Sequence, residues 1–258
     1  MKKIGKTVAH MFQALLFAMP ATAGLAADSE PGRPTFFLDI SGGYSIFKSE
    51  LVQSNDTGIT TRYAFGVNGG TDHQIGMLFA RESSTIAFKN TASSVALSWQ
   101  DIDLRYRLGP IYFGLVVSSS NWTVKSPARV AGKIDETLTS EEYIDLISSG
   151  YGGNVGLQLP VGKRNLMYAD LTYVTTGAVQ QKAAGANGTA AALAAAERVS
   201  TIGPRMELDL GAAIALTRSM FDATVGFKYR TYSVGVDGTT SKELLNTTYA
   251  GLRLNWAF

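Results

Sequence analysis

A period-two alternation of apolar and polar residues runs through most of this 258-residue chain and limits its fold more than any other feature. Near the C-terminus, Leu252, Leu254 and Trp256 share one face, while small or polar residues occupy the other. This alternation is typical of β-strands whose two faces meet different environments. After residue 23 there is no apolar run of about 18 residues, the length that would indicate a membrane-spanning helix. The sequence therefore predicts an all-β protein.

The alternation delimits ten predicted strands, and the connections between them are alternately short and long. The strands cover residues 35–48, 59–70, 73–88, 94–108, 110–123, 149–160, 165–180, 200–216, 219–233 and 244–258. Only residues 73–88 lack a clear apolar face, because Arg81 interrupts the run that Ile75, Met77 and Phe79 begin. Short turns that alternate with long loops are typical of outer-membrane barrels. We predict a transmembrane antiparallel up-and-down β-barrel of ten strands, with eight or twelve strands as the alternatives.

Aromatic residues and charges divide between the two strand faces. The apolar face carries aromatic residues near both ends of the strands, and nearly all strand charges lie on the opposite face. A soluble β-sandwich with one wet face is the alternative, but two aromatic girdles fit the interfaces of a membrane better. The predicted girdle residues are Phe36, Tyr106, Phe113, Phe221, Trp256 and Phe258 at one level and Tyr44, Tyr63, Tyr151, Tyr173 and Tyr229 at the other.

The first 23 residues have the features of an export signal. Lys2, Lys3 and Lys6 precede a mostly apolar stretch, and Ala21 and Ala23 fit the small-residue rule for cleavage. We expect residues 1–23 to be a signal peptide, residues 24–34 a periplasmic segment and residues 35–258 the barrel.

Composition excludes several kinds of site and partner. The chain has no cysteine, which excludes disulfides, cysteine zinc sites, iron–sulfur clusters and thiol nucleophiles. Without the three leader lysines, 20 of the 23 basic residues remain against 21 acidic ones. This balance does not provide the basic surface that nucleic acid requires. We expect no nucleic-acid partner, no cofactor and no metal site.

The export signal, the alternating strands and the final residues 249–258 resemble small bacterial outer-membrane β-barrel proteins, the size class of OmpA-like, opacity-type and omptin-type barrels. Trp256 and the terminal Phe258, with apolar residues at alternate positions before them, resemble the signal that such barrels present to the barrel-assembly machinery. The resemblance implies a bacterial outer-membrane location and contact with membrane lipid and lipopolysaccharide. It covers the whole mature chain but indicates no particular activity. We expect a monomer.

Charges on the second face are predicted to line the lumen and to pair there. A barrel of about eight strands is filled by its side chains, and ten strands leave only slightly more room. An unpaired charge in that space costs several kcal/mol. We therefore predict an ion-pair network that closes the lumen. Its predicted members are Asp39, Arg62, Glu82, Asp101, Asp103, Arg105, Arg107, Asp170, Arg205, Glu207, Asp209, Asp222, Lys228, Arg230 and Arg253.

The sequence does not predict a catalytic site. Omptin-type proteases combine acidic pairs with a histidine, and lipid A deacylase-type barrels combine histidine with serine. Asp101 and Asp103 form one acidic pair and Glu207 and Asp209 a second, but His73 is the only histidine outside the leader and abuts a predicted short turn. We expect no catalytic residue, and we expect the acidic pairs to bind lumen bases.

Three weaker patterns remain. Two lie in long connections between predicted strands, and one lies in a glycine-rich strand. In loop 124–148, residues 139–142 match a helix-capping pattern and precede Tyr143, Ile144 and Ile147 at helical spacing, which predicts one or two helical turns over the barrel mouth. The alanine-rich loop 181–199 is equally compatible with a short helix and an irregular excursion. Glycines between residues 150 and 156 are expected to let the strand bend or a neighbouring side chain fill the lumen.

Loops are where an activity would lie on such a scaffold. We expect a barrel that acts through its extracellular loops in adhesion, envelope structure or the binding of an extracellular or envelope protein. The alternatives are a narrow channel for ions or small solutes and an outer-membrane enzyme that acts on lipid or peptide.

Overall fold

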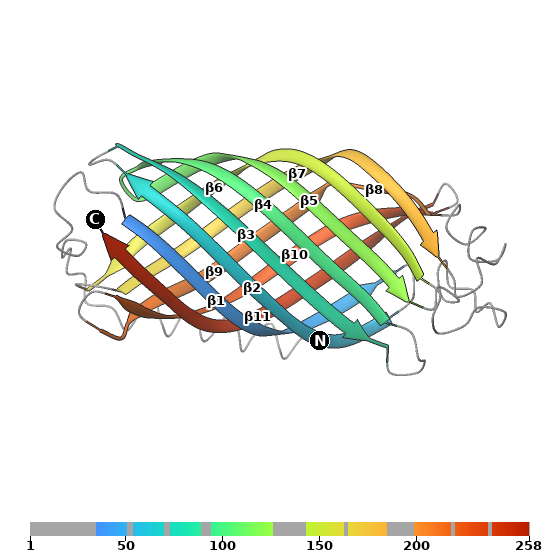
Figure 1. The fold of residues 1–258 in the computed structure, drawn as a ribbon, viewed down its shortest axis with the longest axis horizontal. Helices are drawn as coiled ribbons and strands as arrows, with labels where there is room; N and C mark the ends of the chain where they lie inside the picture. The colour runs from blue at the N-terminus through green and yellow to red at the C-terminus, as the bar shows by residue number, and fades with distance from the viewer. Residues whose placement is uncertain are drawn as a thin grey trace, which may run out of the picture.

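The computed structural model describes residues 35–50, 54–69, 73–88, 94–125, 143–162, 165–184, 199–217, 220–236 and 239–257. These residues form one antiparallel sheet that is closed into a cylinder (Figure 1). The described part of the chain contains no helix long and apolar enough to cross a membrane. The strands are β1 (Thr35–Ser49), β2 (Ser54–Gly69), β3 (His73–Ala87), β4 (Ser94–Leu108), β5 (Ile111–Lys125), β6 (Tyr143–Val161), β7 (Asn165–Ala184), β8 (Val199–Ile202), β9 (Arg205–Ala215), β10 (Phe221–Val236) and β11 (Thr239–Ala257).

The cylinder closes because β1 pairs with β11 along all of its 15 residues. β8 and β9 both pair with β10 and occupy one strand position. They are separated at Gly203 and Pro204, where proline has no N–H for the hydrogen-bond ladder. The described residues therefore make a closed up-and-down barrel of ten strand positions, which confirms the predicted fold class.

The two ends of the barrel differ in their connections. At one end, tight turns join β4 to β5 and β6 to β7, and Gly109 and Gly162 adopt φ values of 57° and 65° that favour glycine. We call this the turn end. At the opposite end β5 stops at Lys125 and β6 starts at Tyr143, so a long connection lies between them. We call this the loop end.

An apolar belt surrounds the barrel on the outside. Its side chains are highly exposed; Leu115, for example, is 70% exposed. Tyr44, Tyr63, Tyr151, Tyr173 and Tyr229 are exposed along its loop-end edge, as their girdle assignment predicted. At the turn end, the rings of Phe36 and Trp256 stack with centroids 5.9 Å apart, and those of Tyr106 and Phe113 lie 5.3 Å apart. A closed hydrogen-bond ladder behind an apolar surface is stable in hydrocarbon, so the barrel spans a membrane.

Between the belt and the loop end, the apolar residues move from the outer face of the strands to the inner face. In β4, Ile102 and Leu104 point outward, whereas Leu97 and Trp99 are buried inside. β4 pairs with β3 and β5 without a bulge, so the change lies in the sequence and not in the backbone. Outside at this level the chain presents polar side chains such as Gln100, which is exposed. We therefore expect the strands to continue past the bilayer into water.

The inward-facing apolar residues of this region form what we call the apolar plug. They come from strands all around the barrel: Phe47, Ile86, Phe88, Val95, Leu97, Trp99, Trp122, Leu146, Val174, Ile202, Tyr232, Val234 and Leu245. Phe47, Ile86, Leu146 and Val234 have no exposed surface. The plug gives the loop-end half of the barrel the core of a water-soluble β-protein.

The structure corrects two predictions about local structure. Tyr143, Ile144 and Ile147 lie in β6, not in a helix, because both neighbouring strands pair with β6 through this stretch. Residues 139–142 lie outside the described residues. β2, β6 and β11 also extend farther toward the loop end than predicted. In these extensions the inward residues include Asp56, Leu146 and Glu243, so the outward-apolar pattern of the belt does not continue.

Inside the membrane-level lumen, large aromatic rings lie over glycines on the neighbouring strand. Each ring and its glycine are directly paired in the register: Phe37 with Gly66, Tyr112 with Gly156, Tyr168 with Gly211, and Tyr249 with Gly226. A Cβ added at any of these glycines would overlap the ring. Gly156 thus does what was expected of this glycine-rich strand, because it admits a neighbouring side chain into the lumen.

Gly152 is expected to tolerate no side chain. A Cβ at this position would overlap the Tyr173 carbonyl oxygen, a backbone atom that cannot move without breaking the β6–β7 ladder. We expect Gly152→Ala to lower the free energy of unfolding in lipid vesicles by about 1–3 kcal/mol, the usual cost of overpacking. Gly42→Ala is the matched control, because no atom lies within 4 Å of its added Cβ. A Gly152→Ala barrel as stable as the Gly42→Ala barrel would contradict the expectation.

Candidate functional site in the lumen

Three layers fill the lumen from the loop end to the turn end. The apolar plug comes first, a central cluster of charges lies below it, and a cavity open toward the turn end follows. Arg230 joins the first two layers, because its guanidinium carbon lies 3.7 Å from the centroid of the Trp99 ring. Such a cation–π contact lets a charged layer pack directly on an apolar one.

The central cluster consists of Glu82, Glu207, Asp209, Lys228 and Arg230, all of which are buried. The Lys228 Nζ lies 2.8 Å from Glu82, 3.0 Å from Glu207 and 3.6 Å from Asp209. Arg230 approaches Glu82 at 2.7 Å and Glu207 at 2.6 Å. Each base thus bridges at least two acids from different strands. This ties β3 to β9 and β10 across the lumen.

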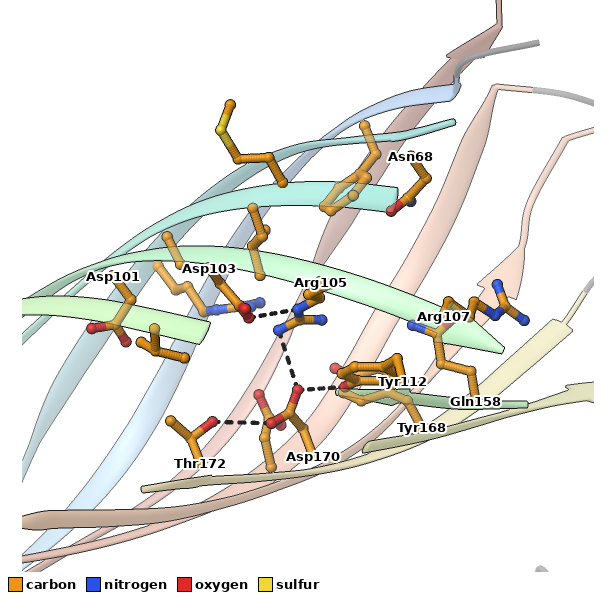
Figure 2. Close-up of a pocket in the computed structure, with 18 of the residues that line it drawn as sticks. Asn68, Asp101, Asp103, Arg105, Arg107, Tyr112, Gln158, Tyr168, Asp170 and Thr172 are labelled. Atoms are coloured by element: carbon orange, nitrogen blue, oxygen red, sulfur yellow. Dashed lines mark hydrogen bonds and ion pairs between the residues drawn. The ribbon is translucent and has the colours of Figure 1, made fainter. Parts of the chain in front are cut away.

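A second cluster lies nearer the turn end and is centred on Arg105 (Figure 2). Arg105 contacts Asp103 at 2.5 Å and Asp170 at 3.2 Å. The Tyr112 hydroxyl donates a hydrogen bond to Asp170. Asn154 donates to Asp103 at 2.5 Å. Both carboxylates are thereby held by charged and neutral donors.

Two smaller groups complete the ion pairs. Asp39 lies 3.2 Å from Arg253 and 3.7 Å from Arg62. Asp101 lies 2.8 Å from Arg205. Since Asp101 and Asp103 bind different bases, the two do not act as a pair.

All fifteen residues predicted for the network lie on the inner face, but two of them form no ion pair with another described residue. Arg107 donates a hydrogen bond from Nε to the Gly109 carbonyl oxygen at 2.8 Å. Asp222 accepts a hydrogen bond from Asn255 at 2.7 Å. These two side chains therefore lie outside the network that the sequence predicted. Of the proposed assembly signal, Trp256 is the penultimate residue of β11, and Phe258 lies outside the described residues.

Sequence reasoning missed the neutral partners of the charges. The Tyr249 hydroxyl donates to Asp209 at 2.6 Å and lies 2.5 Å from the Tyr168 hydroxyl. A second neutral chain joins Ser45 to Thr60 and to Thr247, and Thr60 to Ser84 at 2.6 Å. The sequence signal for Tyr168 and Tyr249 was their position on the polar face of their strands, which places them in the lumen. They could have been identified as ring-filling residues from the glycines that directly oppose them.

The turn-end cavity has a volume of about 270 Å³. Its lining runs from Asn68, Gln74 and Gln158 at the turn end to Trp99 and Arg230 at the lower surface of the plug. We call this space the vestibule. No group of three or more His, Cys, Asp or Glu residues within the described ranges is arranged to hold a metal ion. His73, the only histidine after residue 23, begins β3 at the turn end.

Comparisons with solved structures find β-barrels at very low sequence identity. The outer membrane protease OmpT from Escherichia coli is 10% identical, over 88% of this chain and 97% of that one, with a TM-score of 0.46. The translocator domain of the autotransporter NalP from Neisseria meningitidis is 9% identical, over 98% and 96%, with a TM-score of 0.38. The P. putida toluene transporter TodX is 10% identical, over 89% and 91%, with a TM-score of 0.35. No protein-family model and no curated relative matches the sequence.

Proposed function

We propose that this protein is a non-conducting barrel of the bacterial outer membrane that supports its loop-end connections for adhesion, envelope structure or partner binding. The apolar plug carries the proposal. A pathway for ions needs a continuous polar or water-filled lining. Between the vestibule and the loop end, apolar side chains such as Phe47, Leu146 and Val234 have no exposed surface and interrupt the buried polar side chains of the inner face.

The packing of the plug supports a closed lumen. A cavity of about 30 Å³ lies beside the plug, lined by Leu97, Trp99, Trp122 and Tyr232 together with polar side chains that include Ser118, Ser120, Asn121, Ser148 and Arg205. That volume holds at most about one water molecule. Below it, the charges of the central cluster are held by two or three partners each, so none of them is available to conduct a passing ion.

The outer surface supports the location. The belt, its two aromatic edges and the polar surface beyond it fit a barrel whose loop-end half projects from the membrane. With the N-terminal export features, this favours the outer membrane of a bacterium, with the loop end outside the cell and the turn end in the periplasm.

The lumen carboxylates support a structural role in preference to a catalytic one. Asp101 binds Arg205, Asp103 binds Arg105, and Glu207 lies between Lys228 and Arg230. The plug also separates these residues from the loop end. We propose on these grounds that the barrel does not hydrolyse lipid or peptide in its lumen.

We expect the wild-type protein to pass little ionic current in planar bilayers, and removal of the plug to open a pathway. The variant Leu97→Ser/Leu146→Ser/Leu245→Ser replaces three buried plug residues by smaller polar ones. It connects the vestibule to the loop end, so single-channel conductance should appear while the belt stays intact. Circular dichroism confirms the β-sheet content of each variant before recording.

The matched control widens the opposite end. Asn68→Ser/Gln74→Ser/Gln158→Ser enlarges the vestibule mouth and leaves the plug unchanged. Its conductance should stay at the wild-type level. Large, steady currents through the wild type would overturn the proposal and favour the channel alternative.

A further inference from the structure

The vestibule contains a base that the ion pairs of the lumen do not use. Within the described part of the chain, Arg107 has no carboxylate at ion-pair distance, and its one hydrogen bond joins Nε to the Gly109 carbonyl oxygen. Its two terminal nitrogens therefore have no described acceptor. The neighbouring acids are already bound, because Asp103 and Asp170 both contact Arg105.

Neutral polar side chains surround this guanidinium in the register of the sheet. Gln74 on β3 is directly opposite Arg107, and Tyr112 on β5 is opposite it on the other side. Gln158 on β6 lies two residues from Gly156, the register partner of Tyr112. Figure 2 shows Arg107, Tyr112 and Gln158 at one end of the pocket, away from Asp101 and Asp103. All of these residues line the same cavity.

The geometry points to a binding site for a small organic carboxylate in the vestibule, centred on Arg107. The planar guanidinium presents parallel N–H groups that match the two oxygens of a carboxylate. The amides of Gln74 and Gln158 are further donors. The site is confined by the sheet, and Arg107 has no carboxylate at ion-pair distance among the described residues, so a single ligand carboxylate would match its guanidinium.

One part of the lining can contact an apolar body on that anion. Leu166 and Tyr168 contribute aliphatic and ring surface there, beside the charged residues of the cavity. The volume of about 270 Å³ lies near the lower limit of small-molecule sites, which begin at roughly 300 Å³. This space suits a ligand of the size of benzoate. The inference goes beyond the proposed function, since a ligand in the vestibule leaves the plug closed.

The test is calorimetric titration of the purified barrel in detergent micelles with benzoate, with benzamide as a neutral analogue and inorganic phosphate as a second anion. We expect benzoate to bind and benzamide not to bind. Arg107→Gln should weaken benzoate binding at least about tenfold, the loss that follows removal of a charged hydrogen-bond donor. Arg81→Gln is the matched control, because Arg81 is an exposed arginine on the outer face; its affinity should stay within about twofold of the wild type.

Three outcomes would overturn the inference. The first is no benzoate binding by the wild type. The second is equal binding by the Arg107→Gln variant. The third is binding of phosphate but not of benzoate, which would show that the ligand is not an organic carboxylate. All three are independent of conductance, so they leave the proposed function to its own test.

Discussion

Arg230→Met is expected to lower the free energy of unfolding in lipid vesicles by about 3–5 kcal/mol, as for one partner removed from a buried ion pair. Arg230 is 1% exposed and contacts Glu82 and Glu207. Its removal leaves those acids and Asp209 with Lys228 as their shared base in the central cluster. Methionine fills similar space without the charge, so the loss reports the uncompensated carboxylates more than a cavity.

The double variant Arg230→Met/Glu207→Gln distinguishes the effect of the uncompensated carboxylates from the effect of a cavity. Neutralising one acid removes part of the excess negative charge, so the double variant should be more stable than Arg230→Met alone. Arg81→Met is the control for loss of an arginine from the exposed outer surface, and we expect a change within about 0.5 kcal/mol. If Arg230→Met unfolded at the wild-type denaturant concentration, the cluster would not stabilise the barrel.

Leu115→Lys and Ser119→Lys are expected to differ by about 2–4 kcal/mol in the free energy of unfolding from lipid vesicles. Both positions are exposed on the outer face of β5, four residues apart with Val117 between them. Leu115 lies within the apolar belt, where a lysine at the bilayer midplane carries that cost. Ser119 lies above the belt, where a lysine reaches water.

The same pair tests where the bilayer ends. Strand, face and introduced residue are shared, so the two variants differ in depth in the membrane and in the residue that is replaced. Equal destabilisation would mean that the bilayer covers Ser119 as well as Leu115. The loop-end half of the barrel would then not project into water.

The sequence predicted the barrel well because lipid imposes a simple rule on every strand. Wherever hydrocarbon touches the outer face, as at Leu104 or Leu115, the period-two pattern identifies both the strand and its orientation. The same pattern placed Arg105 and Lys228 on the inner face. It also located the turns at Gly109 and Gly162, where the chain needs positive φ.

The sequence was less informative where that rule stops. Near the loop end, Leu97 and Trp122 point inward, and small or polar residues face water. A strand prediction based on outward apolar residues therefore ends before the strand itself does. Tyr143, Ile144 and Ile147 satisfy helical spacing, and only their pairing with β5 and β7 decides for a strand. The choice of partners within the lumen depends on positions across the barrel. Arg107 and Arg105 share a face and a strand, yet among the described residues only Arg105 lies at ion-pair distance from an acid.

Along β4 the apolar residues change from the outer face to the inner face of the strand. This change also affects how neighbouring strands reach the correct register. A slip of one residue between neighbouring strands turns each side chain to the opposite face. In most β-proteins such an error places one set of apolar residues wrongly. Here it would bring Asp103 and Arg105 into hydrocarbon and, on the same strand, Leu97 and Trp99 into water. Lipid around one half of the strand and water around the other half both disfavour this misalignment. The correct register is therefore favoured independently in each half.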